Sequence, residues 1–526
     1  MLVSVVLLAL PAGYEPHHFA KALFLGALVQ SFAYGCVVLT LTYRSVALKR
    51  IVFTILYLLF CLESYLFIGF ASRLDPNMLT LMLQTSWRET TEFASVYLMS
   101  LSTLSFLVIA VACYIFIYRL LGDRKSQVKW LRGRMIKIAA CILVILGFAI
   151  PYIPLPFPLG NNTINELWMS VSFVKERHSE VATMEEMIDK IAISQSPRED
   201  EAPTIVFVIG ESFNKQHSSL YGYSLRTSPN LEEERDNGNL ICFSHAMSPT
   251  NGTDFAMRFL FTLKGCEYSD SADVRSYVLM PAVFKKAGYH VAYFDNQYTR
   301  LSGGIWDYGC GYFLNPGYIN EKCFDFRNTE TREYDGDFIN SYRASLRKEP
   351  KSLNIIHLMG QHFEASKRYP ASFSHFSQDS IMRNDLSQNQ RQQIAEYDNA
   401  TLYNDQVIRM IIDEFRETNA IIVYLSDHGE QIYDKPHCYF GRGFDTKDEE
   451  ETIKAVYEVP LMVWCSSTFI KENEETYNAL KACANHKICT ADLPYFLFDI
   501  AGIDFNYNIK SRSFIDSTFV PHQTQF

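Results

Sequence analysis

The first 156 residues contain four apolar stretches that are each about 20 residues long, the length that a helix needs to cross the hydrocarbon core of a membrane. A fifth stretch, residues 2–12, is shorter and lacks the basic flank and cleavage site of a signal peptide. We expect it to be a shortened first span, with an interfacial segment as the alternative. The pattern predicts an α-helical membrane domain of about five transmembrane helices over residues 1–156. The four long stretches are residues 20–42, 51–71, 96–118 and 136–155.

Charge is divided along the chain as unevenly as hydropathy. The 526 residues have a formal net charge of −10, yet residues 1–156 hold 13 Lys and Arg against 6 Asp and Glu. This division excludes a disordered chain, a single soluble domain and a nucleic-acid binder that relies on overall basic charge. Basic residues gather in the loops 44–50 and 119–137, and positively charged loops stay in the cytoplasm. We therefore expect residues 72–95 and the chain after residue 156 to face the other side of the membrane, which in a bacterium is the periplasm or the cell exterior.

The chain after residue 156 changes in pattern twice. Residues 157–202 are polar and favour helices, so we predict a connector with helices along the membrane surface. In residues 203–526, short β-branched or aromatic runs alternate with helical stretches such as 388–418. Continuous apolar strands that alternate with helices predict a mostly parallel α/β sheet covered on both faces. The predicted strands are residues 204–212, 290–296, 354–360, 420–430 and 459–465.

Polar side chains follow the predicted strands at their carboxyl ends, where ligands bind in sheets of this kind. Glu211 ends the first strand, and Asp427 and His428 end the fourth. His357 lies in the third strand and His362 follows it. Carboxylate and imidazole together suit Zn²⁺ better than Mg²⁺ or Mn²⁺. The pattern predicts a metal site at this edge of the sheet, and the alternative is an Asp-His pair that only caps a strand.

The segment VFVIGESFNKQHSSLYGYSLRTSPNL, residues 206–231, resembles the start of the catalytic domain of bacterial phosphoethanolamine transferases of the lipid A and lipooligosaccharide type. These enzymes belong to the alkaline phosphatase and sulfatase superfamily. Five spans before a periplasmic domain also fit, so the resemblance covers nearly the whole chain. It implies an alkaline-phosphatase-like catalytic domain over residues 203–526. The later matching segments are SPTNGTDFAMRFLFT (248–262), FDNQ (294–297), HLMGQH (357–362), SDHGE (426–430) and His437 with GR (441–442).

The resemblance implies a metal site of Glu211, Thr253, Asp427 and His428 that holds one zinc ion or two. Thr253 would be the nucleophile, because metal coordination makes a hydroxyl competent to attack. Thr250 is close enough in the sequence to compete for this role. The chain has Asn251-Gly252-Thr253 where the lipid A enzymes often have Cys-Gly-Thr.

Further residues are expected to bind substrate. The resemblance implies Asn296 and Gln297, with Arg300 in place of a loop lysine of the family. His362 and His437 would hold substrate phosphate or a second zinc ion. In the 72–95 loop, Glu89 belongs to a polar face that either meets lipid headgroups or is a solvated surface helix.

The expected reaction has two steps. Thr253 attacks the phosphorus of phosphatidylethanolamine, diacylglycerol leaves, and phosphoethanolamine then passes to an envelope acceptor such as lipid A or lipopolysaccharide core. Three alternatives remain: a glycerol-phosphate transferase of the lipoteichoic acid type, a sulfatase, and a membrane sensor with a degenerate hydrolase domain. A sulfatase is disfavoured because SPTNG (248–252) lacks the Arg of the C/S-x-P-x-R motif.

Eight of the 12 cysteines lie within residues 203–526. An even number in a domain outside the cytoplasm predicts disulfides. The sequence does not determine their connectivity. The local pairs Cys310–Cys323 and Cys483–Cys489 are the first candidates.

Overall fold

A computed structural model describes nine parts of the chain, and the structural statements below concern these residues. By contacts the chain divides into two compact units, Met1–His178 and Ser179–Phe526, and each is considered by itself. The division falls inside the predicted connector, residues 157–202. The described residues are 46–70, 90–91, 101–122, 179–266, 273–299, 311–434, 440–442, 450 and 453–520.

Two apolar helices of the first unit, α3 (Val46–Phe70) and α6 (Leu101–Gly122), overlap the predicted spans 51–71 and 96–118. They contact each other through aromatic and hydroxyl groups. The Tyr57 hydroxyl donates to the Ala110 carbonyl at 2.7 Å, and the Thr54 and Tyr114 hydroxyls lie 2.9 Å apart. None of the described helices combines the length and the apolarity that a membrane crossing requires. The other predicted spans, residues 2–12, 20–42 and 136–155, lie outside the described residues.

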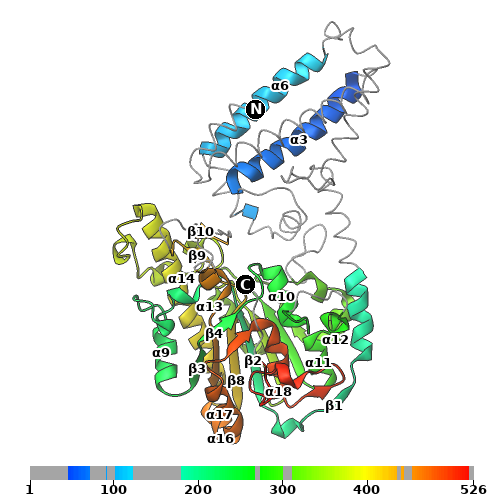
Figure 1. Cartoon of the computed structure of the whole chain (residues 1–526), viewed down its shortest axis with the longest axis vertical. Coiled ribbons are helices and arrows are strands. Elements are labelled where there is room, and N and C mark those ends of the chain that lie inside the picture. The colour runs from blue at the N-terminus through cyan, green and yellow to red at the C-terminus, as the bar shows by residue number, and fades with distance from the viewer. Residues whose placement is uncertain are drawn as a thin grey trace. The chain divides into compact units, whose positions relative to one another are not determined.

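A seven-stranded sheet organises the second unit, in the order β3-β11-β8-β2-β7-β5-β6 (Figure 1). The central strand β2 is parallel to β7 on one side and to β8 on the other, and β7, β5 and β6 continue in parallel. Of the seven strands in this sheet only β11 is reversed in direction, so it pairs antiparallel with both β8 and β3. The mostly parallel α/β architecture is therefore confirmed. The strands are β2 (Thr204–Gly210), β3 (Leu240–Phe243), β5 (His290–Asp295), β6 (Phe326–Arg327), β7 (Ser352–His357), β8 (Ala420–Ser426) and β11 (Leu461–Cys465).

Helices cover both faces of this sheet, which explains why β2 and β8 are buried along their whole length (Figure 1). On one face, α14 (Gln388–Phe415) packs against α13 (Asp335–Tyr342) and α9 (Pro229–Asp236). A capping box between Ser387 and Gln390 starts α14, because each side chain satisfies a backbone N–H of the other residue. The helices on the other face are α10 (Thr253–Phe261), α11 (Met280–Lys286), α12 (Gly317–Cys323) and α18 (Leu493–Ile500).

Smaller elements lie around this core. Two short helices, α16 (Ser467–Glu472) and α17 (Glu474–Ala482), follow β11. Three two-stranded sheets complete the described unit. They pair β1 (Ile193–Gln195) with β13 (Asp504–Phe505), β4 (His245–Met247) with β12 (Lys487–Cys489), and β9 (Gln431–Ile432) with β10 (Phe440–Gly441).

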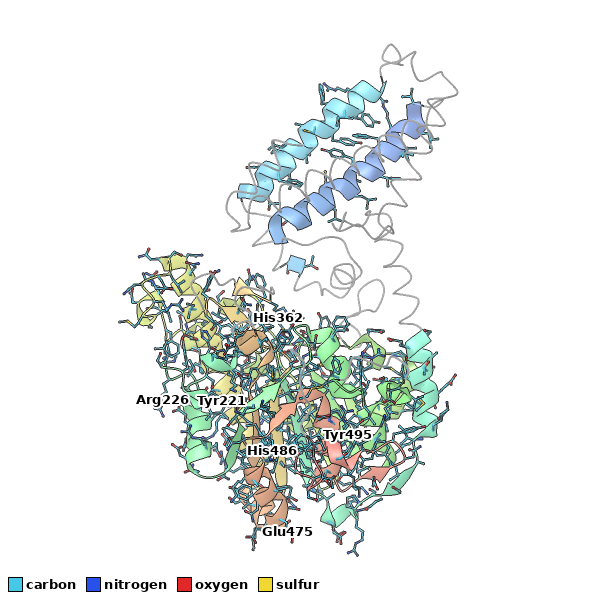
Figure 2. The ribbon with its side chains drawn as sticks, in the orientation of Figure 1. Tyr221, Arg226, His362, Glu475, His486 and Tyr495 are labelled. Carbon is cyan, nitrogen blue, oxygen red and sulfur yellow. A yellow bond between two sulfur atoms is a disulfide. The ribbon has the colours of Figure 1, made fainter. Side chains whose placement is uncertain are left out.

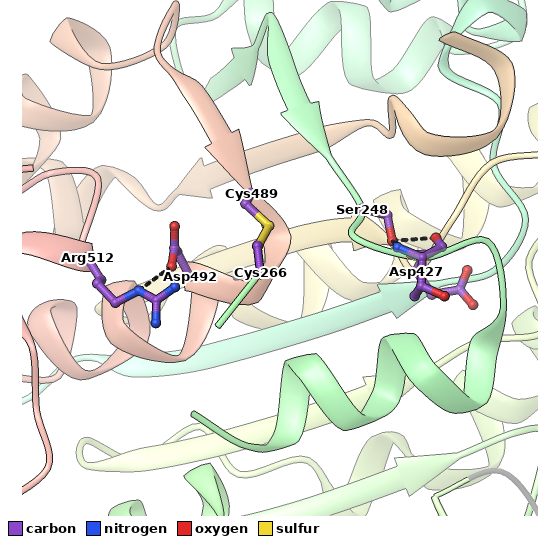
Figure 3. Close-up of a disulfide and its surroundings, with 7 residues drawn as sticks. Ser248, Cys266, Asp427, Cys489, Asp492 and Arg512 are labelled. Atoms are coloured by element: carbon purple, nitrogen blue, oxygen red, sulfur yellow. Dashed lines mark hydrogen bonds and ion pairs between the residues drawn. A yellow bond between two sulfur atoms is a disulfide. The ribbon is translucent and has the colours of Figure 1, made fainter. Parts of the chain in front are cut away.

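A disulfide joins Cys266 to Cys489, across 223 residues of sequence (Figure 3). The predicted pair Cys483–Cys489 is wrong, because Cys483 keeps a free, buried thiol. Cys489, at the end of β12, packs against Phe259 of α10 and against Cys266 in the segment that follows this helix. Cys323 also carries a free, buried thiol, which contradicts its predicted pairing with Cys310, a residue outside the described parts. Proximity in sequence was therefore a poor guide to these cysteines.

Candidate active site

The register between β2 and β8 brings the predicted acidic residues together. Gly210 at the end of β2 lies opposite Ser426 at the end of β8, so Glu211 and Asp427 leave the sheet side by side. His428 follows Asp427, and one ligand atom from each of these three side chains lies within 4.8 Å of the other two. All three are buried. We call Glu211, Asp427 and His428 the strand-end cluster.

Thr253 meets this cluster from the start of α10. Its hydroxyl donates to Glu211 Oε2 at 3.0 Å and lies 3.2 Å from His428 Nε2. The structure thus brings together the four residues predicted for the metal site. Thr250 is buried, and its hydrogen bonds with the Ser248 hydroxyl use its backbone. The geometry therefore favours Thr253 over Thr250 as the reactive hydroxyl.

The hydrogen bonds of the cluster direct lone pairs toward one point. His428 Nδ1 lies 2.8 Å from the Gly429 carbonyl, which only accepts, so Nδ1 carries a proton, and Nε2 presents a lone pair once the ring is neutral. Asp427 Oδ1 accepts from the backbone N–H groups of Ser212 and His428 at 3.1 and 2.7 Å. Its other oxygen, Oδ2, is buried, lies 3.1 Å from His428 Nε2, and has no hydrogen-bond donor among the described residues once that ring is neutral. A buried oxygen without a donor fits a cation ligand.

The backbone of Asp427 is held as firmly as its side chain. The Ser248 hydroxyl, in the segment that leads to Thr253, donates to the Asp427 carbonyl at 2.5 Å (Figure 3). The same Ser248 hydroxyl contacts the Thr250 carbonyl. The segment that leads to Thr253 and the end of β8 therefore share one hydrogen-bonding group. This link fixes the distance between the reactive hydroxyl and the carboxylate cluster.

Charges within the cluster shift the pKa values of Glu211 and Asp427 in opposite directions. Burial alone raises the pKa of Glu211, but the positive charges of His428, His362 and Arg442 outweigh it and hold the pKa well below its usual range. For Asp427, burial and then the like charge of Glu211 raise the pKa to about 6. Two carboxylates this close repel each other, and a divalent cation between them would favour the charged form of both.

A second layer of side chains holds the cluster in place. Gln297 Nε2 donates to Glu211 Oε2 at 3.1 Å and to the Leu358 carbonyl at 2.8 Å, so it positions the ligand. Asn296 is buried, and its amide contacts Asp335 and the backbone of Arg332. These contacts join the loop after β5 to the start of α13 and to the segment before it, and substrate binding by Asn296 stays a prediction.

The histidines of the HLMGQH segment lie at different depths. His357 is fully buried, with Nδ1 3.1 Å from Asp295 Oδ1. His362 is half-buried in the loop after β7, and its charge contributes to the low pKa of Glu211. Three further predicted residues, Glu89, Arg300 and His437, lie outside the described residues.

Gly360, in the same segment, allows the loop after β7 to reach the cluster. Its φ is +48°, and a Cβ placed there would lie 2.8 Å from both the N and the O of Glu211. The next residue, Gln361, donates its backbone N–H to the Glu211 carbonyl at 3.0 Å. A larger residue would therefore displace the ligand backbone.

Sequence analysis did not assign three residues that complete the site. Ser212, at φ 55°, donates its hydroxyl to Glu211 Oε1 at 2.6 Å. Arg442 Nη2 lies 3.7 Å from the same Glu211 oxygen, and Arg442 Nε donates to Glu430 Oε2 at 3.1 Å. Ser212, Glu430 and Arg442 all belong to segments that match the family, so the resemblance pointed to their positions but not to their roles. The distance in sequence between Arg442 and the other site residues did not indicate that its side chain lies beside Glu211, at the end of β2.

Comparisons with known proteins agree with this geometry. Residues 203–503 match the sulfatase family. The chain belongs to this family. It is similar to phosphoethanolamine transferase EptC of Escherichia coli K12, at 24% identity over 488 residues, 86% of this chain and 79% of that protein. Kdo(2)-lipid A phosphoethanolamine 7''-transferase of the same strain is 28% identical over 298 residues, 56% of this chain and 50% of that protein.

Solved structures extend the comparison. The C-terminal periplasmic domain of E. coli EptC, solved as a complex with Zn, superposes with a TM-score of 0.50 at 25% identity, covering 61% of this chain and 88% of that one. The integral membrane protein EptA from Neisseria meningitidis covers 94% of this chain and 97% of its own, with a TM-score of 0.60 and 15% identity, a similarity of fold. The resemblance to phosphoethanolamine transferases, the alkaline-phosphatase-like fold and the assignment as an enzyme of this class are confirmed.

Proposed function

We propose that the protein transfers phosphoethanolamine from phosphatidylethanolamine to a cell-envelope acceptor, lipid A or lipopolysaccharide core. One observation carries the proposal: the Thr253 hydroxyl lies within hydrogen-bonding distance of both Glu211 and His428 in a buried carboxylate–imidazole cluster. The similarity to enzymes that are named for this transfer supports the choice of donor group.

The residues of the site fit a zinc ion. Glu211, Asp427, His428 and Thr253 would hold it, since they offer two carboxylates, one imidazole lone pair and a hydroxyl. The observation that favours a cation is the buried Asp427 Oδ2, which lies 3.1 Å from His428 Nε2 and has no hydrogen-bond donor among the described residues once that ring is neutral. When bound, zinc supplies a Lewis acid that stabilises the Thr253 alkoxide and the charge on the phosphoryl group. His362 and His437 remain candidates for substrate phosphate or a second ion.

The chain's own residues define the course of the reaction. Thr253 Oγ1 forms a bond to phosphorus while the bond from phosphorus to the diacylglycerol oxygen breaks. The hydroxyl proton leaves along the contacts with Glu211 Oε2 and His428 Nε2, and the departing diacylglycerol oxygen gains a proton. A hydroxyl or phosphate of the acceptor then displaces Thr253 from phosphorus and restores its hydroxyl.

The position of Thr253 on α10 suits this covalent intermediate. Thr253 is the first residue of the nine-residue helix, which begins after Gly252. The first N–H groups of a helix have no partner within it, and the helix dipole is positive at this end. Phosphate oxygens attached to Thr253 would therefore meet backbone donors and a favourable field.

Membrane attachment completes the proposal. Residues 1–156 would hold the enzyme in the bacterial inner membrane, residues 157–202 would connect it along the surface, and residues 203–526 would act in the periplasm. The Cys266–Cys489 disulfide supports an oxidising compartment. An enzyme anchored in this way meets a lipid donor without a search through bulk water.

Mass spectrometry of lipid A and core oligosaccharide tests the proposal in cells that lack other transferases of this class. Wild-type protein should add one phosphoethanolamine unit, and Thr253→Ala should add none while it folds and accumulates normally. Thr250→Ala is the matched control, and we expect it to keep activity. Normal modification by Thr253→Ala would overturn the proposal. Purified protein supplied with phosphatidylglycerol in place of phosphatidylethanolamine tests the glycerol-phosphate alternative.

A further inference from the structure

Arg442 places a guanidinium group at the edge of the strand-end cluster. Its side chain is 28% exposed, whereas the Glu211 side chain beside it is fully buried. Glu211 joins the two groups of interest, because Oε1 lies 3.7 Å from Arg442 Nη2 and Oε2 accepts the Thr253 hydroxyl at 3.0 Å. The guanidinium therefore lies one carboxylate away from the proposed nucleophile, at the point where the buried cluster meets solvent.

Two contacts fix the orientation of this side chain. Nε donates to Glu430 Oε2 at 3.1 Å, and the Glu430 carbonyl is itself held by Asn214 Nδ2 at 2.9 Å. On the other side, Arg442 and Asn251 exchange long hydrogen bonds, from Nη1 to the Asn251 carbonyl at 3.4 Å and from Asn251 Nδ2 to the Arg442 carbonyl at 3.3 Å. Asn251 is two residues before Thr253, so these hydrogen bonds link Arg442 to the segment that carries the proposed nucleophile.

The guanidinium retains capacity to bind a ligand. Arginine has five N–H donors. Among the described residues, only the contact with Glu430 is of ordinary hydrogen-bond length, and those with Ser212 and Asn251 are both 3.4 Å. Guanidinium groups bind phosphate oxygens with two parallel hydrogen bonds. The two Nη groups are thus available for a stronger acceptor.

We propose that Arg442 is a catalytic residue that binds the non-bridging oxygens of the phosphodiester and of the phosphothreonine formed from it. This deepens the proposed function and rests on it. Both species are anionic, and they must approach Glu211 and Asp427, which carry the same sign of charge. A permanent cation held at this edge offsets the repulsion and stabilises the charge on the transferring phosphoryl group.

Substitution of Arg442 in the purified full-length protein tests this role. With phosphatidylethanolamine as donor, Arg442→Ala should lower kcat/KM by about 10²- to 10³-fold, the usual effect of losing one donor to a transition-state oxyanion. Arg442→Lys should recover only part of the loss, because an ammonium group cannot donate two parallel hydrogen bonds. Added guanidinium ion should partly rescue Arg442→Ala and not Arg442→Lys.

A purely structural role predicts a different outcome and is tested by a double variant. Arg442→Gln combined with Glu430→Gln removes both charges of the pair, so it restores local neutrality without a guanidinium. We expect wild-type zinc content and thermal stability in this variant but the same loss of transfer as Arg442→Ala. Recovered transfer would overturn the proposal. Arg226→Ala is the matched control, because its side chain is 73% exposed and far from His362 (Figure 2).

Binding of inorganic phosphate separates this inference from the proposed function. Titration calorimetry at constant ionic strength should show weaker phosphate binding to Arg442→Ala than to wild-type protein, by about tenfold or more. Equal affinity for phosphate would overturn the inference even if transfer activity were confirmed. If Thr253→Ala remained active, the proposed function would fail while the phosphate result still decided the role of Arg442.

Discussion

Two buried clusters of charge lie in the same unit and differ in how their polar atoms are satisfied. In the strand-end cluster, Asp427 Oδ2 lies 3.1 Å from His428 Nε2 and has no hydrogen-bond donor in the described chain once that ring is neutral. The second cluster, which we call the His217 cluster, consists of His217, Asp398, Asp434 and Tyr223. His217 Nδ1 lies 2.7 Å from Asp398 Oδ1 and Nε2 lies 3.4 Å from Asp434 Oδ1. The remaining oxygens accept from the Tyr223 hydroxyl at 2.8 Å and from the Ile432 N–H at 2.9 Å.

This difference distinguishes a cluster that binds a ligand from a cluster that only stabilises the fold, when both are buried and charged. A fully paired network gains nothing from a ligand and fixes the segments that carry it. Here it joins α14 to the segments after β2 and β8. An oxygen left without a donor costs free energy unless something outside the chain coordinates it. Residue type alone does not distinguish the clusters, since each combines two carboxylates with one imidazole.

The largest expected effect comes from neutralising the unsatisfied carboxylate. Asp427→Asn should lower phosphoethanolamine transfer by at least about 10³-fold and reduce bound zinc, because the variant loses an anionic ligand. Its free energy of unfolding without zinc should stay close to wild type or rise, since repulsion from Glu211 is removed. Lipid product assays, elemental analysis and denaturant unfolding measure these three quantities. A large loss of stability in the zinc-free variant would contradict the contrast between the clusters.

His217→Gln should produce the opposite result. It leaves two buried carboxylates without their cation, so the free energy of unfolding should fall by about 3–5 kcal/mol. Zinc content per folded molecule should not change. Asp434→Asn in the same background should recover part of the loss, because one of the uncompensated charges is then gone. Loss of zinc with unchanged stability would show that the two clusters do not divide their roles in this way.

A smaller effect should appear in the dependence of stability on pH. Burial lowers the pKa of His217, but Asp398 and Asp434 outweigh it and raise the pKa to about 10. A pKa raised above its unfolded value of about 6.5 stabilises the fold fully below that pH, and this contribution disappears as pH rises through about 10. Wild-type protein should therefore lose more stability than His217→Gln between these pH values. If the free energy of unfolding changed equally with pH in the two proteins, His217 could not be charged in the folded state.

Local pattern predicted the strand-end cluster well, because its residues directly follow long apolar strands. Glu211 and Asp427 needed only the rule that parallel strands end at one edge. Thr253 came from the resemblance, since a threonine at a helix start has no distinctive pattern of its own. Arg442 was not assigned because its position depends on the path of the chain after β8, which residue spacing does not encode.

Long-range arrangement was predicted less well for the same reason. The apolar run of β11 predicted a strand, but strand direction is set by pairing with β8 and β3 and not by composition. The short strands β3 and β6 have too few residues for a periodic signal. Cys489 paired with Cys266 because β12 lies beside β4, a contact between segments more than 200 residues apart.

The reversed direction of β11 has a consequence for how this enzyme can be altered. Leu425 near the end of β8 lies opposite Leu461 at the start of β11, so the intervening segment leaves and re-enters the sheet at one edge. That segment carries Asp427, His428, Glu430 and Arg442, and its described residues after Ser426 contribute no strand to the main sheet before β11. The part of it beyond Asp434 can be lengthened, shortened or exchanged between relatives without a change in strand register. In engineering terms this part is a cassette, and chimeras that swap it would change Arg442 at the rim of the site while Glu211, Asp427 and His428 stay in place.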